Sequence, residues 1–430
     1  MSPAGGTSAV TCLGCGCACD DLTVRVAGGR ITEVAPPCPL GRAWFGDGVV
    51  PGRILRAGAE VSLDAALAEA AETLAGARGD VQVLLAPDLS TQAQQAALAL
   101  ADLLRASVDT TTSEPAAAGL LAAQRRGRAA ATLGEVRNRA DVLLFWGIDP
   151  TPRYPRYLSR YALDPMGTHV PSGRAGRTVI SVSIGQDRGP AGAEIELALA
   201  PDQEIAALSV MRAVALGHAL GELPAPLQAV PDAATRLTTA AYAVLVHDAE
   251  PGAESGRDPY RAEGLIALTQ ALNGRTRAAL SSLRAGGNRS GAEAALTWQT
   301  GYPMAVSFGA GYPRYAPASR GLAERMAGRS NGRGAPILVA GAVAALGAAL
   351  AEAARHSPVI IIGPRASEVP FAARVAIDTG VAGIHEGGTA YRMDEVPLPL
   401  RPPLDGARSA VATLSALLDL VRTRPAGRTG

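Results

Sequence analysis

The sequence has almost no net charge, few aromatic residues and no long hydrophobic run. Lys and Arg number 40 against 39 Asp and Glu, so the chain lacks the basic field that draws proteins to nucleic acid. Aromatic residues make up 4% of the chain, but 48% of its residues are hydrophobic, which is ample for a sizeable core. No apolar run reaches the roughly 20 residues that cross a bilayer. We therefore expect partners that are neither nucleic acid nor membrane.

The start of the chain also lacks a secretory signal. The opening MSPAGG contains no basic stretch and leads into no apolar core, so we expect a cytoplasmic protein. The length of 430 residues predicts two or three domains.

Cysteine is absent from nine-tenths of the chain and crowded near its start. The five cysteines are Cys12, Cys15, Cys17, Cys19 and Cys38. A spacing of C-x2-C-x3-C with one distant member suits an iron–sulfur cluster held by four thiolates. In a reducing compartment, clustered cysteines more often bind metal than each other. We expect Cys12, Cys15, Cys19 and Cys38 to be the ligands.

Two other interpretations of the cysteines stay open. Structural zinc sites usually combine two close cysteine pairs, whereas here the fourth cysteine is alone. A site that stays free of metal is the second alternative. Gly14 and Gly16 are expected to let the backbone fold tightly, so that the sulfurs converge. Cys17 is expected not to be a ligand.

The rest of the chain alternates between strand and helix patterns. Leu22–Val26 and Arg30–Val34 alternate around a Gly-Gly turn, which indicates a hairpin that holds Cys38 over the first three cysteines. Helices are expected from Ser62 to Gly79, from Ser90 or Thr91 to Leu104, and from Asp202 onward. Buried strands are expected at Val81–Ala86, Val142–Trp146, Thr178–Ile184 and Val359–Gly363, and residues 337–354 are expected to hold a strand and an Ala-rich helix.

This alternation predicts an α/β protein with parallel sheets covered on both faces. Ligands of such sheets bind at the carboxyl ends of the strands, which makes the loops after Trp146, Ile184 and Ile362 candidate site loops. The expected segments are a Cys-rich β module at 1–55, α/β segments at 56–140, 141–310 (Rossmann-like) and 311–400 (returning), and a C-terminal helix and tail at 401–430. Leu223–Arg236 and Arg314–Gly334 are predicted to be linkers or mobile loops, and Thr423–Gly430 a disordered tail.

Several motifs resemble one known family over roughly residues 10–400. They are CLGCGCACDD with CPLG at 38–41, TLGEVRNRAD at 132–141 leading into FWG, PRYLSRY at 155–161, TWQTGYP at 297–303, YPRY at 312–315 and GIHEGGTAYRMD at 383–394. On these residues the chain is identified as a member of the family formed by the B subunits of formylmethanofuran dehydrogenases. The resemblance implies the molybdopterin-oxidoreductase fold, as in formate dehydrogenases.

The resemblance also implies cofactors. Dehydrogenases of this family hold a 4Fe–4S cluster on the four cysteines matched here by Cys12, Cys15, Cys19 and Cys38. They also hold molybdenum or tungsten on a pair of pyranopterin guanine dinucleotides, with a cysteine followed by a histidine at the metal.

This chain departs from the family at that metal. Pro115 stands where the cysteine is expected and Ala116 where the histidine is expected. Neither side chain carries a donor atom, so we expect the redox metal centre to be lost. Glu114 could offer a carboxylate, but a carboxylate does not usually replace a soft thiolate ligand. Arg284 matches a family arginine near this centre and is a candidate anion contact.

In lacking these two ligands, the chain resembles the B subunit of the bacterial formyltransferase/hydrolase complex. That complex moves a formyl group from formyl-tetrahydromethanopterin to methanofuran or a related amine and hydrolyses it to formate. The resemblance implies an amidohydrolase-like A subunit, a C subunit and a formyltransferase D subunit as partners, with the B subunit as scaffold. Alternatives are an active molybdenum or tungsten dehydrogenase and an electron-transfer iron–sulfur subunit. Whether this chain is itself an enzyme stays open.

Other polar residues carry two interpretations each. His385 and Arg392 face the pterin in family terms, or belong to a Gly-rich turn with a buried arginine. Asp187 either meets a nucleotide or closes an ordinary turn. Arg156, Arg160 and Arg314 contact an anion or another subunit, or pair within the chain. No ligand spacing connects the remaining histidines, His169, His218, His247 and His356, which are expected to be structural or exposed.

Overall fold

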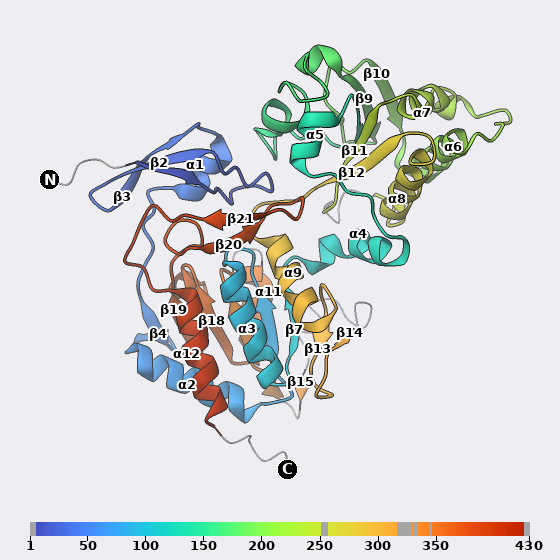
Figure 1. Ribbon diagram of the computed structural model, residues 1–430. Coiled ribbons are helices and arrows are strands. Elements are labelled where there is room, and N and C mark those ends of the chain that lie inside the picture. Colours follow the sequence, from blue (N-terminus) through green and yellow to red (C-terminus); the bar gives the residue numbers. More distant parts are fainter. Residues whose placement is uncertain (1–5, 251–256, 316–328, 331–332, 344–345, 425–430) are drawn as a thin grey trace.

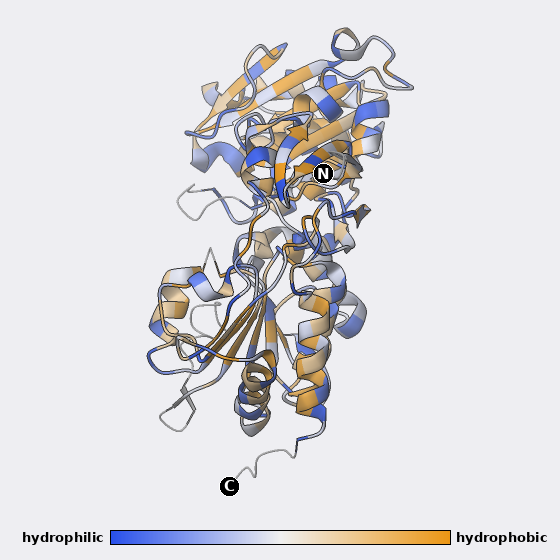
Figure 2. Ribbon diagram, turned by 90° about the vertical axis from the view of Figure 1, so that its left-hand side faces the viewer, coloured by the Kyte–Doolittle hydropathy of each residue, from blue (hydrophilic) through white to orange (hydrophobic). Residues whose placement is uncertain are grey.

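The computed structural model describes residues 6–250, 257–315, 329–330, 333–343 and 346–424. The chain forms two α/β domains with a small β module beside them (Figure 1). Hydrophobic residues concentrate on the strands of the two large sheets (Figure 2). No helix among these residues is long and apolar enough to span a membrane.

The small module contains the cysteines. Its strands β1 (Gly6–Val10), β2 (Leu22–Ala27) and β3 (Arg30–Ala35) pair antiparallel in that order. The predicted hairpin is confirmed, because Val24 pairs with Val34 across a turn in which Gly28 and Gly29 have positive φ. Helix α1 (Pro39–Phe45) follows, and the Cys38 side chain caps its first turn.

The larger domain is built on a nine-stranded sheet. Its strand order is β14 (Arg314–Tyr315), β13 (Val306–Ser307), β7 (Ser107–Thr110), β6 (Gln82–Leu85), β17 (Ile337–Ala340), β18 (Val359–Gly363), β19 (Val375–Asp378), β4 (Ile54–Arg56), β5 (Ala59–Glu60). The five strands from β7 to β19 are parallel, and the strands at both edges are antiparallel. This confirms a parallel sheet, and the antiparallel edges were not predicted.

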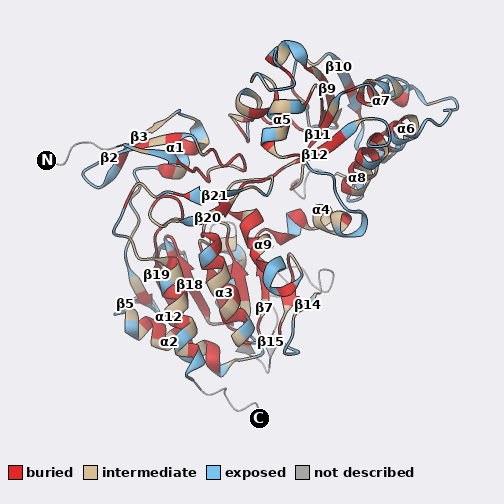
Figure 3. Ribbon diagram, viewed as in Figure 1, coloured by how far each residue is buried: buried red, intermediate tan, exposed pale blue. Residues whose placement is uncertain are grey.

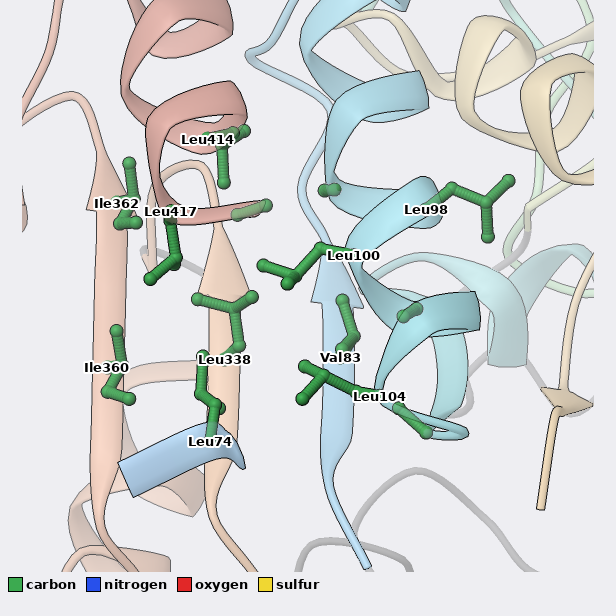
Figure 4. Close-up of a cluster of buried hydrophobic side chains, with 14 of the residues drawn as sticks. Leu74, Val83, Leu98, Leu100, Leu104, Leu338, Ile360, Ile362, Leu414 and Leu417 are labelled. Carbon is green, nitrogen blue, oxygen red and sulfur yellow. The ribbon is translucent and has the colours of Figure 1, made fainter. Parts of the chain in front are cut away.

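Helices cover both faces of this sheet, and its strands are buried between them (Figure 3). One face packs against α2 (Leu63–Gly76), α3 (Thr91–Leu103), α9 (Arg289–Thr300) and α12 (Ala410–Arg422). Figure 4 shows Leu414 and Leu417 of α12 beside Leu338, Ile360 and Ile362 of the sheet. The alternate strand residues face α11 (Gly347–Ala353) on the other side. The strand and the helix expected within 337–354 are thus confirmed.

The smaller domain is a five-stranded sheet that is parallel throughout. Its order is β10 (Ile195–Leu199), β9 (Thr178–Ile184), β8 (Val142–Trp146), β11 (Tyr242–Asp248), β12 (Arg277–Leu283). Helices α6 (Glu204–Leu216), α7 (Val230–Thr238) and α8 (Arg261–Leu272) cover one face. The other face is covered by helix α5 (Leu133–Arg139) and by three buried tyrosines, Tyr154, Tyr157 and Tyr161.

One predicted linker is wrong. Residues 230–238 within and beyond Leu223–Arg236 form α7, which buries Val230, Ala233, Ala234 and Leu237. These residues have the spacing of one helix face, and a proline at the helix start is favourable. Most of Arg314–Gly334 and the end of the tail Thr423–Gly430 lie outside the described residues.

The chain passes from one domain to the other at positions that differ from the predicted segment boundaries. Helix α4 (Ser113–Arg126) packs against α8, and α5 packs on the turn Leu158–Ala162, so residues 113–140 accompany the smaller domain. Helix α9 and β13 then return to the larger domain. A hairpin of β20 (Gly388–Tyr391) and β21 (Pro397–Leu400) lies between the module and the larger sheet (Figure 1).

Helix α12 is expected to stabilise the larger domain through its buried leucines. Replacing Leu417→Ala removes a side chain with no exposed surface, and should lower the free energy of unfolding by about 2–5 kcal/mol. The exposed Leu216→Ala on α6 is the control, and should change it far less. Urea unfolding followed by circular dichroism measures both; equal effects would mean that α12 does not pack as described.

Candidate functional site

The four predicted cysteine ligands surround one small cavity. Cys12, Cys15, Cys19 and Cys38 line it together with Leu22, Val34, Pro36, Gly41, Pro155 and Arg156. The first three belong to the loop between β1 and β2, which the Cys12 N–H closes by donating to the Cys19 carbonyl at 2.9 Å. Cys17 does not line this cavity, and is fully buried in the core of the smaller domain.

The glycines of this loop are required by close packing against other segments. A Cβ at Gly14 would lie 2.7 Å from the carbonyl oxygen of Leu40, and a Cβ at Gly16 would lie 2.1 Å from that of Arg284. The Met393 N–H also donates to the Gly16 carbonyl at 3.1 Å. The tight fold expected from Gly14 and Gly16 is confirmed, and its cause is the approach of distant backbone.

Backbone donors and a neighbouring thiol act on the sulfurs. The N–H groups of Gly14 and Gly41 point at the sulfurs of Cys12 and Cys38, at 3.3 and 3.2 Å. Burial raises the pKa of the Cys12 thiol, and the hydrogen bond from Cys17 lowers the pKa of Cys15. N–H donors to sulfur are typical of sites where metal-bound thiolates accept them.

The chemistry of the donor set can be compared with that of a cluster and of a single ion. Within the described residues, no three side chains of His, Cys, Asp or Glu are close enough to hold one metal ion. A zinc ion requires four ligands around a single point, whereas the irons of a cluster are spread over a larger core. Four thiols around a common cavity, with N–H groups on two sulfurs, fit the cluster.

The structure places the two residues that stand at the family's metal position on helix α4. Pro115 lies exposed on the first turn of α4, while Ala116 is buried and lines a cavity of about 40 Å³. That cavity also has His247, Arg284 and Glu293 in its wall. Because proline and alanine side chains carry no donor atom, the residues at 115 and 116 do not fit a molybdenum or tungsten centre bound through a protein side chain. Glu114 is exposed.

Arg284 is held by carboxylates on two sides. Its Nε donates to Glu250 at 2.8 Å, and its two terminal nitrogens donate to Glu293 at 2.7 and 2.5 Å. Although burial opposes the charge, Glu293 and Glu250 raise the pKa of Arg284. A candidate anion contact would have to compete with these two carboxylates. No local pattern in the sequence pointed to either partner.

His247 lines the same cavity from the end of β11. Its Nε2 lies 2.8 Å from the Ser282 hydroxyl, and its Nδ1 lies 3.2 Å from the Asp248 carbonyl. Burial lowers the pKa of His247 to about 3, so this imidazole stays neutral and is poorly suited to take a proton near pH 7. The expectation of a structural histidine is confirmed here, and His169, His218 and His356 are exposed.

Arginines from the smaller domain bind the acidic pair that follows Cys19. Arg156 donates to both carboxylate oxygens of Asp21, at 2.8 and 2.6 Å. Arg160 donates to Asp20 at 2.7 Å and also to Asp21. Pairing within the chain is thus the interpretation that the structure supports for both arginines. The partners Asp20 and Asp21 were missed, although their position directly after a predicted ligand cysteine was a usable signal.

The other candidate residues make local contacts. His385 donates from Nε2 to the Gly48 carbonyl at 2.7 Å and accepts the Val381 N–H at Nδ1. Arg392 forms a two-pronged pair with Asp394, at 2.7 Å for each contact. These contacts match a Gly-rich turn with a buried arginine.

Asp187 closes the turn after β9 and accepts from Arg257 at 2.8 Å, which matches an ordinary turn. Arg314 is exposed at the start of β14.

Comparison with known proteins identifies relatives over nearly the whole chain. No protein-family model matches. The chain is 32% identical over 434 residues to the B subunit of the tungsten-containing formylmethanofuran dehydrogenase 2 of Methanocaldococcus jannaschii, covering 96% of this chain and 97% of that one. It is 32% identical over 264 residues to the B subunit of the formyltransferase/hydrolase complex Fhc of Methylorubrum extorquens, covering 60% of this chain and 67% of that one.

A solved structure also matches. It is the crystal structure of the formyltransferase/hydrolase complex FhcABCD of Methylorubrum extorquens in complex with methylofuran, in which a chain superposes with a TM-score of 0.68 at 27% identity. The match covers 86% of this chain and 98% of that chain.

Neutralising one partner of Arg284 should destabilise the protein strongly. Glu293→Gln leaves the buried Arg284 guanidinium with one of its two carboxylate partners, Glu250. This change should lower the free energy of unfolding by on the order of 3 kcal/mol. Glu352→Gln, in an exposed pair with Arg355, is the matched control. Urea unfolding compares the two, and equal midpoints would contradict the structural role assigned to Arg284.

Stability should depend on pH through His247. The folded protein keeps this imidazole neutral to about pH 3, whereas the unfolded chain takes up its proton below about pH 6.5. The unfolded state then binds more protons, so stability falls as pH drops from about 6.5 toward 3. His247→Gln should remove this loss, which amounts to at most about 1.4 kcal/mol per pH unit.

The measurement is urea unfolding of the wild type and His247→Gln at about pH 7, 6 and 5. The exposed His356→Gln is the control and should follow the wild type. A difference between wild type and His247→Gln that stays constant with pH would rule out a buried neutral His247.

Proposed function

The chain belongs to the family formed by the B subunits of formylmethanofuran dehydrogenases, and from that premise we propose that it is the scaffold B subunit of a formyltransferase/hydrolase complex. The observation that carries the proposal is the pair Pro115 and Ala116, which offers no donor atom at the family's metal position. Arg284, the candidate anion contact, forms ion pairs with Glu250 and Glu293.

The proposed chemistry needs no redox centre. A formyl group passes from a tetrahydromethanopterin carrier to methanofuran or a related amine, and hydrolysis then releases formate; neither step moves electrons. We assign these steps to the partners, with formyl transfer on the D subunit and hydrolysis on the amidohydrolase-like A subunit, beside the C subunit. The solved FhcABCD complex with methylofuran supports such an assembly. Here the chain contributes to one-carbon metabolism through assembly rather than catalysis.

The finer fold assignment is part of the proposal. We propose the molybdopterin-oxidoreductase architecture. It is supported by the cysteine-bearing β module next to two α/β domains, and by the insertion of the smaller sheet, in sequence, between strands β7 and β13 of the larger sheet. A cytoplasmic location is supported by five free cysteines, because such thiols persist in reducing compartments.

The cysteines are proposed to hold a 4Fe–4S cluster. Cys12, Cys15, Cys19 and Cys38 would be its ligands, and the N–H groups of Gly14 and Gly41 would donate to two of the sulfurs. Such a cluster supplies one-electron storage when bound. For this chain its main contribution is structural, because the free energy of metal binding adds to the folding of the small module.

The tungsten-containing relative supports a second candidate, an active molybdenum or tungsten dehydrogenase. That function would require a metal held on pterin alone, without a ligand from residues 115 or 116. Metal analysis separates the two candidates.

The protein purified without oxygen should contain about four irons and four sulfides per chain, and neither molybdenum nor tungsten. Cys12→Ser removes one ligand and should lose the iron. Cys17→Ser changes a buried cysteine outside the cavity and should keep it. Elemental analysis and the visible absorbance of the cluster measure both variants.

Each outcome decides between the candidates. Stoichiometric molybdenum or tungsten would refute the scaffold role and support the dehydrogenase. A chain without iron would refute the cluster but leave the scaffold role intact. The scaffold role itself fails if the complex hydrolyses formyl substrate equally well when this chain is left out.

A further inference from the structure

A short segment of the smaller domain lies against the cysteine loop. Tyr154, Pro155, Arg156, Arg160 and Tyr161 follow β8, and Leu158–Ala162 form a π-helical turn closed by the Leu163 N–H on the Leu158 carbonyl at 2.9 Å. π-Helical turns are rare and are frequently found at functional sites.

The two arginines are held beside the cysteine loop. Arg156 lines the cysteine cavity, and Arg160 donates to Asp20, the residue that directly follows Cys19. Their side chains are only 18% and 17% exposed. Asp20 and Asp21 hold both guanidinium groups, so their geometry is set before any metal binds.

Charge balance indicates what this arrangement serves. Two arginines against two aspartates are neutral while the cysteines are thiols. Four metal-bound thiolates outweigh the positive charge of an iron–sulfur core, so the loaded site is negative. Arg156 lines the cavity of this site, and Arg160 is paired with the residues directly after Cys19.

Tyr161 supplies an independent observation. Its ring lies under the guanidinium groups of Arg160 and Arg392, at 5.0 and 5.6 Å from the ring centre. Its hydroxyl is buried and has no hydrogen-bond partner among the described residues. Tyr161 and Cys19 belong to the same cluster of buried side chains. A buried hydroxyl without a partner is uncommon in folded proteins.

We propose that Arg156, Arg160 and Tyr161 are positioning residues for the iron–sulfur site: the two guanidinium groups, oriented by Asp20 and Asp21, direct their positive charge toward the sulfurs, and the Tyr161 hydroxyl donates to the Cys19 thiolate or to an adjacent sulfide. The inference rests on the proposed cluster. Partners of this kind orient metal ligands and tune their electronic properties, so these residues set how firmly the cluster is held and the potential at which it is reduced.

The experiment uses the full chain purified without oxygen. Tyr161→Phe removes only the hydroxyl, and Arg160→Gln removes one cation. Arg174→Gln is the matched control, because Arg174 pairs with Glu194 elsewhere on the smaller domain. Iron content, the rate at which a chelator withdraws iron, and the midpoint potential from an EPR-monitored redox titration are measured for each.

Arg160→Gln should lose iron to the chelator about 10–100-fold faster than the control, and Arg160→Lys should restore part of this. Tyr161→Phe should keep its iron but have a more negative midpoint potential, because one donor to sulfur is lost. A purely structural role would not move the potential. Tyr161→Phe keeps the packed ring, so the test survives even if Arg160→Gln folds poorly.

Two results would overturn the inference, and they are distinguishable. If the wild type holds iron and both variants behave like Arg174→Gln, the positioning role fails while the cluster stands. If the wild type holds no iron, the cluster and this inference fail together.

Discussion

The buried arginine Arg284 joins three parts of the molecule. It directly follows the last strand of the smaller domain, its guanidinium pairs with Glu293 on a helix of the larger domain, and its carbonyl oxygen lies against Gly16 of the cysteine loop. A buried charge that lost its partner would be strongly destabilising. The two domains and the cysteine loop are therefore held in one relative arrangement, and both candidate sites depend on it.

The same junction leaves the cavity beside Ala116 with its charges matched by the chain itself. The cavity beside Ala116 is lined by a neutral histidine and by an arginine whose charge is matched within the protein. Histidine and arginine both have partners from the chain itself, so no cofactor is needed to compensate them. In the cysteine cavity, by contrast, four thiols from one loop and one helix cap line a common space.

The sequence allowed the central strands, the hairpin and the four cysteines to be recognised, because buried parallel strands and clustered thiols leave strong local patterns. It did not allow α7 to be recognised, since the proline- and alanine-rich run around Pro231 has the composition of a linker. The partners of Arg284 and of Arg160 were also missed. Those contacts join residues far apart in the chain, and no local pattern encodes which carboxylate meets which arginine.

The order of strands in the larger sheet has a consequence for synthesis of the chain. Strand β6 pairs with β17, and these strands begin at Gln82 and Ile337, about 250 residues apart. At the usual elongation rate of roughly 5–20 residues per second, the edge of β6 that pairs with β17 stays unpaired for about 10–50 s, until β17 has been synthesised. The smaller domain is completed within that interval. On the ribosome, the inserted domain is therefore whole while the domain that encloses it in sequence still has an open strand edge.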